Sequence, residues 1–134
     1  MDLREILETC RTIAVVGARD KPSQAGFYVG EYLVQAGYGV VPVSPRLAGG
    51  QLWGQPVVAT LADLPAPVDL VNVFRKSQDV PQHLEEILAL DPLPRVVWLQ
   101  LGIRNQAVAR ALEARGIQVV QDRCTLAEHR RLGL

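Results

Sequence analysis

Arginine recurs directly after the short apolar segments of this sequence that have the composition of buried β-strands. Five segments follow such runs: Gly17-Ala18-Arg19, Ser44-Pro45-Arg46, Phe74-Arg75-Lys76, Gln100-Leu101-Gly102 and Asp122-Arg123-Cys124. Four of the five contain an arginine, so positive charge is expected to gather wherever these segments meet. In an open parallel sheet, ligands bind in the crevice beyond the carboxyl ends of the strands. The pattern therefore predicts a site for an anionic ligand, and phosphate is the anion that such edges bind most often.

The first of these segments has the features of a phosphate-binding loop. Gly17 ends a β-branched apolar run and allows a ligand to approach the main chain closely. Where a strand leads into a helix, the unpaired N–H groups at the helix start attract anions. A valine at position 17 would lie in the path of the phosphates, so Gly17→Val is expected to abolish binding while leaving the fold marginal at worst. The alternative interpretation is a simple strand-to-helix turn, because short glycine motifs are not specific.

The ligand is not expected to be NAD. The G-x-G-x-x-G fingerprint of dinucleotide sites is absent, because the next glycine after Gly17 is Gly26. The second strand ends in Ser44-Pro45-Arg46 and lacks the acidic residue that binds an NAD ribose. Arg46 could instead accept a phosphorylated ribose, which leaves NADP and any 2′- or 3′-phosphorylated adenosine as alternatives.

Cys124, Glu128 and His129 suggest a nucleophilic site, because cysteine and histidine form such pairs in enzymes. Their spacing argues against it, since five residues along a helix turn Cys124 and His129 in different directions. Thr125 and Glu128 also match a helix capping box, which favours a structural role for this segment. No metal site is expected, because the chain has only two histidines and its two cysteines are far apart.

The elements that would position these residues alternate along the whole chain. Strands are predicted at 13–16, 39–43, 69–74, 95–99 and 117–120, with a further short extended piece at 53–58. Helices are predicted at 3–10, 26–36, 60–63, 80–88, 108–115 and 125–131, with Asp79 as the N-cap of the fourth. This alternation predicts a single α/β domain over residues 1–134, with a five-stranded parallel sheet and helices on both faces.

Composition limits the remaining classes of function. Lysine plus arginine and aspartate plus glutamate each number 14, so the formal net charge is zero and neither nucleic acid nor an anionic membrane is an expected partner. No stretch is long and apolar enough to span a membrane, and the N-terminus does not have the pattern of a signal peptide. Cys10 and Cys124 predict no disulfide framework, so we expect a cytoplasmic protein.

The same segments, taken in order, resemble the CoA-binding domain family. These are small stand-alone proteins similar to the N-terminal domain of the succinyl-CoA synthetase α subunit. The resemblance spans about Thr12 to Leu132 and rests on linked motifs: Ile13-Ala14-Val15-Val16-Gly17-Ala18 with Asp20-Lys21-Pro22-Ser23, Tyr38-x-Val40-Val41-Pro42-Val43-Ser44-Pro45, Val68-Asp69-Leu70-Val71-Asn72-Val73-Phe74-Arg75, Val97-Trp98-Leu99-Gln100-Leu101-Gly102, and Asp122-Arg123-Cys124 with Glu128-His129.

The resemblance implies a Rossmann-like domain that binds CoA or an acyl-CoA through its 3′-phospho-ADP part. By matching position, it implies phosphate contacts at Gly17, Ala18, Arg19 and Lys21, flanking of the adenosine phosphate by Ser44, Pro45 and Arg46, an adenine and ribose wall at Phe74 and Arg75, and closure of the crevice by Leu101 and Gly102. The second synthetase domain has no counterpart in this chain, so ligase activity is not implied and no catalytic residue is expected. A small NADP-dependent reductase or another nucleotide-binding enzyme remains the alternative.

Overall fold

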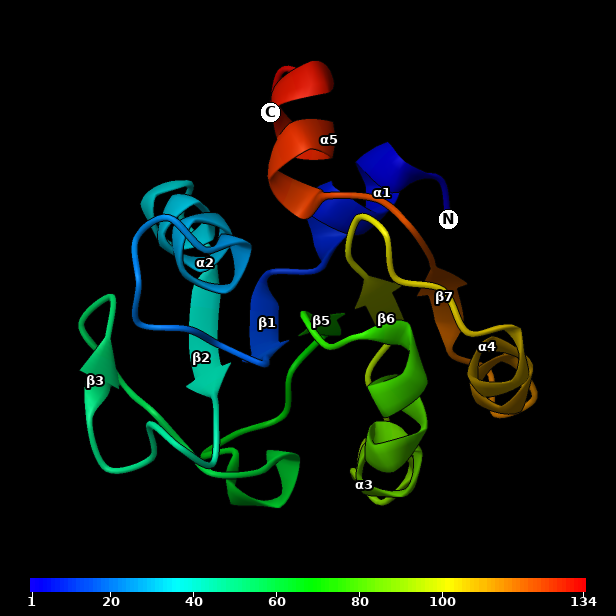
Figure 1. Cartoon of the computed structure of the whole chain (residues 1–134). Coiled ribbons are helices and arrows are strands. Elements are labelled where there is room, and N and C mark those ends of the chain that lie inside the picture. The colour runs from blue at the N-terminus through cyan, green and yellow to red at the C-terminus, as the bar shows by residue number, and fades with distance from the viewer.

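The centre of the molecule is a five-stranded parallel sheet with the strand order β2-β1-β5-β6-β7. The computed structural model describes all residues from Met1 to Leu134. The strands are β1 (Thr12–Val16), β2 (Gly39–Val43), β5 (Leu70–Val73), β6 (Val96–Leu99) and β7 (Gln118–Val120) (Figure 1). The predicted α/β class and the predicted five-stranded parallel sheet are both confirmed. In the register, Val16 pairs with Val43 on one side and with Val73 on the other, so three strands end level with one another.

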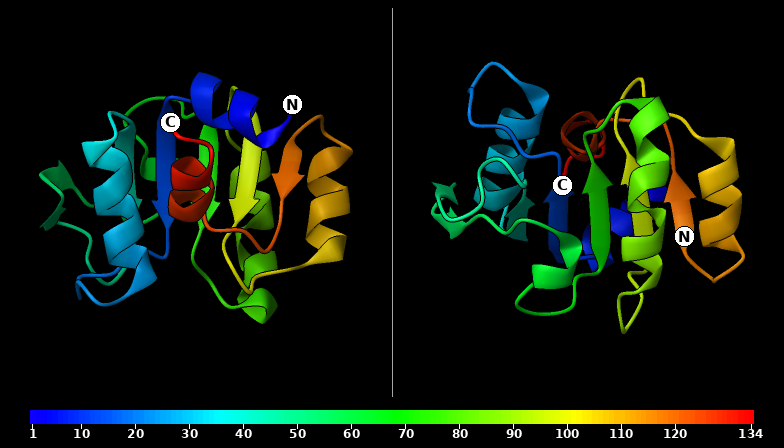
Figure 2. Two further views of the ribbon diagram at one scale, coloured as in Figure 1. Left: turned by 90° about the horizontal axis from the view of Figure 1, so that it is seen from above. Right: turned by 60° about the horizontal axis from the view of Figure 1, so that its bottom comes forward.

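Helices cover both faces of this sheet, as predicted (Figure 2). One face carries α1 (Leu3–Thr9), α2 (Ala25–Gln35) and α5 (Thr125–Arg131). The other face carries α3 (Leu84–Leu88), α4 (Gln106–Glu113) and two 3₁₀ segments, η1 (Leu61–Asp63) and η2 (Ser77–His83). None of these helices has the length and hydrophobicity that crossing a membrane would require.

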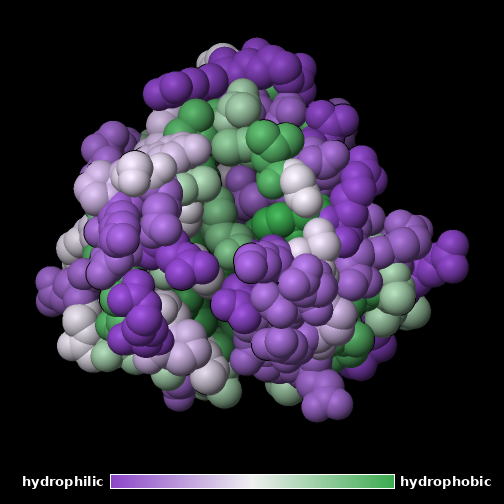
Figure 3. Space-filling model, viewed as in Figure 1, coloured by the Kyte–Doolittle hydropathy of each residue, from purple (hydrophilic) through white to green (hydrophobic).

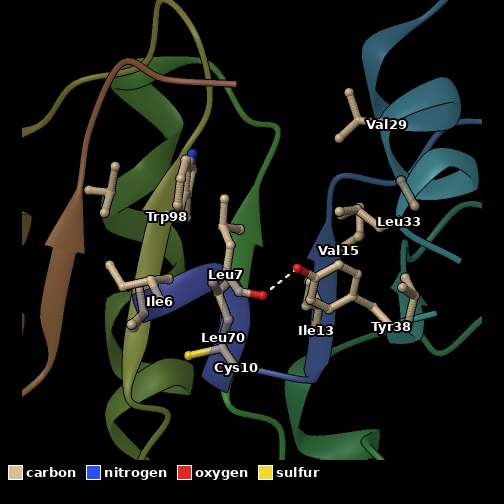
Figure 4. Packing of buried hydrophobic residues seen from close by; sticks show 14 of the residues in the cluster. Ile6, Leu7, Cys10, Ile13, Val15, Val29, Leu33, Tyr38, Leu70 and Trp98 are labelled. Atoms are coloured by element: carbon tan, nitrogen blue, oxygen red, sulfur yellow. Dashed lines mark hydrogen bonds between the residues drawn. The ribbon is translucent and has the colours of Figure 1, made fainter. Parts of the chain in front are cut away.

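Residues of β1 alternate between two separate hydrophobic cores. Ile13 and Val15 belong to the core beneath α1, α2 and α5, while Ala14 and Val16 belong to the core on the other face. Burying one such side chain contributes about 1.5–3 kcal/mol, so both faces contribute to stability. In the first core, the hydroxyl of Tyr38 donates a hydrogen bond to the carbonyl oxygen of Leu7, which joins α1 to the start of β2 (Figure 4).

The extended piece predicted at 53–58 is part of a small hairpin. Strands β3 (Gln51–Leu52) and β4 (Gln55–Pro56) pair antiparallel, and Val58 then bridges to the end of β2. At the tip of the hairpin, the ring of Trp53 packs on α2, with its centroid 6.0 Å from that of Phe27. The hairpin thereby covers the outer side of α2.

The helix predicted at 80–88 is wrong in its first half. Residues Ser77–His83 form a 3₁₀ segment, and only Leu84–Leu88 are α-helical. Pro81 lies inside the 3₁₀ segment and has no N–H group to continue an α-helical ladder. Asp79 is therefore not an N-cap. The capping box predicted at 60–63 is confirmed, because Thr60 and Asp63 cap η1 reciprocally.

Candidate functional site

The strand order reverses between β1 and β5, because the chain continues from β1 to β2 on one side and returns to β5 on the other. Gly17 follows β1 at this switch point, and Phe74 follows β5 beside it. Gly17 has φ +83°, and a Cβ there would lie 2.5 Å from the carbonyl oxygen of Phe74. The sheet itself therefore requires a glycine. Gly17→Val would strain the backbone and bring the new side chain against the neighbouring strand, so a folding cost adds to the expected loss of binding.

The amide groups at the start of the loop after β1 are already hydrogen-bonded within the protein. The N–H groups of Gly17 and Ala18 donate to the carbonyl oxygen of Val43, over 3.1 and 3.3 Å, and that of Arg19 donates to Gly26 over 3.2 Å. Two unpaired donors that line the crevice lie further along the chain, at the first residues of α2. Gln24 caps this helix without a side-chain hydrogen bond, and the N–H groups of Ala25 and Gly26 have no partner in the protein. Because α2 is 11 residues long, its aligned peptide dipoles add to the attraction for an anion at this end.

Gly26 holds this helix start against the loop. A Cβ at position 26 would lie 2.8 Å from both Arg19 Cγ and the carbonyl oxygen of Gly17. No side chain larger than hydrogen fits there, so the helix amides and the Arg19 side chain are brought to the same place. A guanidinium beside two unpaired amides is a suitable arrangement for phosphate.

Two cavities meet at this point, and we name them by the strand end that each one covers. The β2-side cavity, of about 390 Å³, is lined by Val16, Gly17, Ala18, Arg19, Val43, Ser44, Pro45, Arg46, Ala59, Thr60, Arg75, Gln82, His83 and Glu86. The β6-side cavity, of about 420 Å³, is lined by Gly17, Arg19, Gln24, Ala25, Gly26, Tyr28, Phe74, Arg75, Lys76, Gln100, Leu101, Ile103 and Cys124. Gly17, Arg19 and Arg75 line both, so the cavities form one two-part crevice. The corresponding face has an apolar furrow between hydrophilic flanks (Figure 3).

All the predicted site residues except Lys21 and Gly102 line this crevice. Lys21 lies on the exposed loop between β1 and α2. The N–H group of Gly102 donates to Asp122 Oδ1 over 2.6 Å, which joins the turn after β6 to the turn after β7. This hydrogen bond, together with the nearby Arg104, lowers the pKa of Asp122 below its ordinary value. Leu101 lies on the rim with 71 % of its surface exposed.

The structure adds lining residues that sequence reasoning missed. Thr60, Gln82, His83 and Glu86 reach the β2-side cavity from η1, η2 and α3. The sequence signal for His83 and Glu86 was weak, because neither follows a strand and both lie in a stretch that reads as an ordinary surface helix.

Carboxylates neutralise most of the arginines at this edge. Arg46 pairs with Asp20 at 3.4 Å, Arg75 approaches Asp79 at 4.0 Å, and Arg123 pairs with Glu128 at 3.2 Å. Arg19 has no such partner. It carries the uncompensated positive charge where the two cavities join.

A buried polar cluster lies under the β6-side cavity. Asn72, at the end of β5, and Gln100, after β6, each donate from a side-chain amide to the hydroxyl of Thr125 over 3.2 Å. Thr125 is fully buried, and the N-cap of α5 is Cys124. The prediction of a capping box at Thr125 and Glu128 is therefore wrong. Glu128 instead pairs with Arg123 and Arg131. Burial alone would raise the pKa of Glu128, but the hydrogen bonds from Arg131 and Arg123 outweigh it and lower the pKa.

Cys124 and His129 face different cavities, as their spacing predicts. Cys124 lines the β6-side cavity, whereas His129 lines a third groove between α1, α2 and α5. There, His129 Nδ1 lies 2.6 Å from the hydroxyl of Tyr32. Burial, helped by the charge of Arg11, lowers the pKa of His129.

A parallel sheet with a two-part crevice over its switch point, and with an arginine and a helix start at the centre of that crevice, defines a Rossmann-like domain. The chain belongs to the CoA binding domain family, whose family model matches residues 11–130.

Known proteins are similar to this chain over nearly its whole length. An uncharacterized protein of Bacillus subtilis, YneT, is 34 % identical over 128 residues, which cover 96 % of this chain and 92 % of that protein. A solved structure from Thermus thermophilus is 48 % identical with a TM-score of 0.93, covering 98 % of this chain and 96 % of its own. A hypothetical protein from Pyrococcus horikoshii is 31 % identical with a TM-score of 0.91, covering 99 % of this chain and 91 % of its own.

Proposed function

We propose that this protein binds CoA or an acyl-CoA at the crevice, through the 3′-phospho-ADP part of the ligand, and that it carries out no reaction of its own. One observation supports this most strongly. The unpaired amides of Ala25 and Gly26 lie beside Arg19, which has no carboxylate partner, where the two cavities join. A ligand with a diphosphate at its centre and a different group at each end matches that arrangement.

In this proposal, the diphosphate lies at the start of α2. Phosphate oxygens accept from the amides of Ala25 and Gly26 and from the guanidinium of Arg19. The amides of Gly17 and Ala18 are not available, since both donate to Val43. Gly17 has no side chain, so the ligand can lie close to the backbone at the switch point.

The adenosine lies in the β2-side cavity, and its 3′-phosphate is held by Arg46. The absence of an acidic residue at the end of β2 supports a phosphorylated ribose over a free one. Ser44 occupies that place, is buried, and accepts a hydrogen bond from the N–H group of Leu47 over 3.3 Å. Asp20 is the ion-pair partner that the ligand phosphate must displace from Arg46.

The pantetheine chain lies in the β6-side cavity. Phe74, Leu101 and Ile103 supply apolar lining there. The side-chain NH2 group of Gln100 already donates to Asn72 and Thr125, so its side-chain oxygen is the atom that can accept from the amides of the chain. A non-catalytic role is supported by the separation of Cys124 from both histidines, since His83 lines the β2-side cavity and His129 the third groove. The thiol therefore has no imidazole base beside it.

Thermal unfolding with CoA, NADP and NAD tests this proposal. A ligand present at a hundred times its dissociation constant stabilises the folded state by about 2.7 kcal/mol. For a chain of this size, we expect CoA to raise Tm by roughly 10 °C and NAD to leave it unchanged. A shift from NADP as large as that from CoA would favour the reductase alternative. No shift from any of the three would contradict ligand binding at the crevice.

A further inference from the structure

Two of the three buried side-chain polar atoms that lack a hydrogen-bond partner belong to residues lining the β2-side cavity. They are Nε2 of His83 and Nε of Arg75, and the third is the indole nitrogen of Trp53. Buried polar atoms are nearly always paired, because leaving one unpaired is costly. Two such atoms on residues that line one cavity point to a ligand that completes their hydrogen bonds.

The opposite nitrogen of His83 is fixed. Its Nδ1 lies 2.8 Å from Glu86 Oε1, on the next turn of the chain at the junction of η2 and α3. A carboxylate oxygen only accepts, so Nδ1 carries the hydrogen. In the neutral ring, Nε2 then has a lone pair and acts as an acceptor.

Arg75 offers the complementary group. The terminal nitrogen Nη2 of its guanidinium lies 4.0 Å from Asp79 Oδ2, which draws the end of the side chain toward η2. Its Nε–H remains unpaired and can only donate. The residues that line the cavity therefore hold one unpaired acceptor and one unpaired donor.

With the His83 ring in its neutral form, this pair does not suit a phosphate. Phosphate oxygens accept only, so they would leave the lone pair of His83 unused, and the negative charge of Glu86 would repel them. The phosphate-binding charge of the cavity comes from another wall, at Arg46 after β2. The edge of an adenine ring has the required complement, because its 6-amino group donates and the neighbouring N7 accepts.

We propose that His83, oriented by Glu86, reads the adenine base of the ligand together with Arg75. His83 Nε2 accepts from the 6-amino group, and Arg75 Nε donates to the ring nitrogen beside it. The inference rests on the proposed function, because it assumes that a 3′-phosphoadenosine group enters this cavity. It makes His83 a specificity residue that discriminates adenine from purines with an oxygen at position 6.

Calorimetry with adenosine 3′,5′-bisphosphate and inosine 3′,5′-bisphosphate tests the proposal. Inosine carries an oxygen in place of the 6-amino group, so His83 loses its donor and meets a second acceptor. We expect the parent protein at pH 8 to bind the adenosine ligand roughly five- to tenfold more tightly than the inosine ligand. His83→Phe should reduce that ratio to about one, mainly by weakening the adenosine ligand.

Two further variants separate base reading from packing. Glu86→Gln should also reduce the ratio, because an amide can donate to Nδ1 and let the ring place its hydrogen on Nε2. Glu85→Gln is the matched control, since Glu85 is an exposed carboxylate beside Glu86 on α3 that lines neither cavity, and this variant should keep the parent ratio. If His83→Phe does not fold, as judged by circular dichroism, the ratio of affinities measured for Glu86→Gln tests the proposal in its place.

A parent ratio of one, or an unchanged ratio in both His83→Phe and Glu86→Gln, would overturn the assignment of His83. Titration with CoA keeps this failure distinct from failure of the proposed function. If CoA binds the parent while the two bisphosphates bind equally, only the base reading is wrong. If CoA and both bisphosphates fail to bind, the proposed function fails and this inference fails with it.

Discussion

At the residue scale, Arg46 is an exposed side chain that is expected to contribute to ligand choice. Its side chain is 63 % exposed and already pairs with Asp20. A charge-assisted hydrogen bond to phosphate is worth about 1.5–3 kcal/mol, and exposure reduces it toward or below the lower limit. We therefore predict that the parent prefers CoA to dephospho-CoA several-fold and that Arg46→Ala removes most of this preference. Calorimetry of both proteins with both ligands forms a closed cycle that isolates the contact.

Asp20 provides the control for that measurement. Asp20→Asn removes the competing carboxylate from Arg46, so the preference for CoA over dephospho-CoA should increase. If Arg46→Ala instead weakens both ligands equally, Arg46 contacts the diphosphate or acts through packing, and the adenosine is misplaced.

His129 should make stability depend on pH in a defined window. Because burial lowers its pKa in the folded protein, the unfolded chain binds the proton more readily. Its contribution is fully present above the ordinary pKa of 6.5 and is lost progressively as the pH falls below that value. Asp122 and Glu128, whose folded pKa values are lowered, lose their contributions only in more acidic solution.

Urea unfolding between pH 8 and pH 5 measures this window. We expect the free energy of unfolding of the parent to fall with acidification, and that of His129→Gln to fall less. Glutamine keeps an acceptor for the hydroxyl of Tyr32 but does not titrate. Parallel curves for the two proteins would show that His129 does not control the slope.

At the scale of the elements, the start of α2 is a close packing contact. Replacing a glycine inside a helix by alanine normally stabilises the helix by about 1 kcal/mol. At Gly26, however, the added Cβ would lie 2.8 Å from the backbone oxygen of Gly17. We predict that Gly26→Ala destabilises the protein by about 1–3 kcal/mol, as overpacking usually does, and weakens CoA binding by moving the amides.

Gly39→Ala is the matched control for this prediction. A Cβ at position 39 would make only an ordinary contact, 3.6 Å from a methyl carbon of Thr12. The free energy of unfolding of the Gly39→Ala protein should stay within about 0.5 kcal/mol of that of the parent. A Gly26→Ala protein as stable as Gly39→Ala would contradict the packing argument.

Regular elements could be predicted from this sequence because their signals are local. β-Branched runs mark the strands, and the apolar stripe of α1 is visible in the positions of Leu3, Ile6 and Leu7. Irregular details depended on distant partners. Thr125 is held by Asn72, 53 residues away, and Gly17 is required by the carbonyl of Phe74. No local pattern contains that information.

At the scale of the whole molecule, a chain with zero net charge concentrates binding groups at one edge of its sheet. Ligands of open parallel sheets bind beyond the carboxyl ends of the strands, and those ends can be predicted from sequence. This rule alone located most of the candidate site. It did not locate His83 and Glu86, which lie on η2 and α3 on the other face of the sheet, nor the amides of Ala25 and Gly26. Which amides of a loop remain unpaired depends on tertiary hydrogen bonds such as those to Val43.

The central claim is that CoA binds across the start of α2 at the switch point, and amide NMR during a CoA titration tests it most directly. The account predicts that the largest chemical-shift changes occur at Ala25 and Gly26, with further changes at Gly17 and Leu101. Gln35 and Ala36, in the third groove beside His129, should remain unchanged. Largest changes at that groove, or no changes at saturating CoA, would contradict the account.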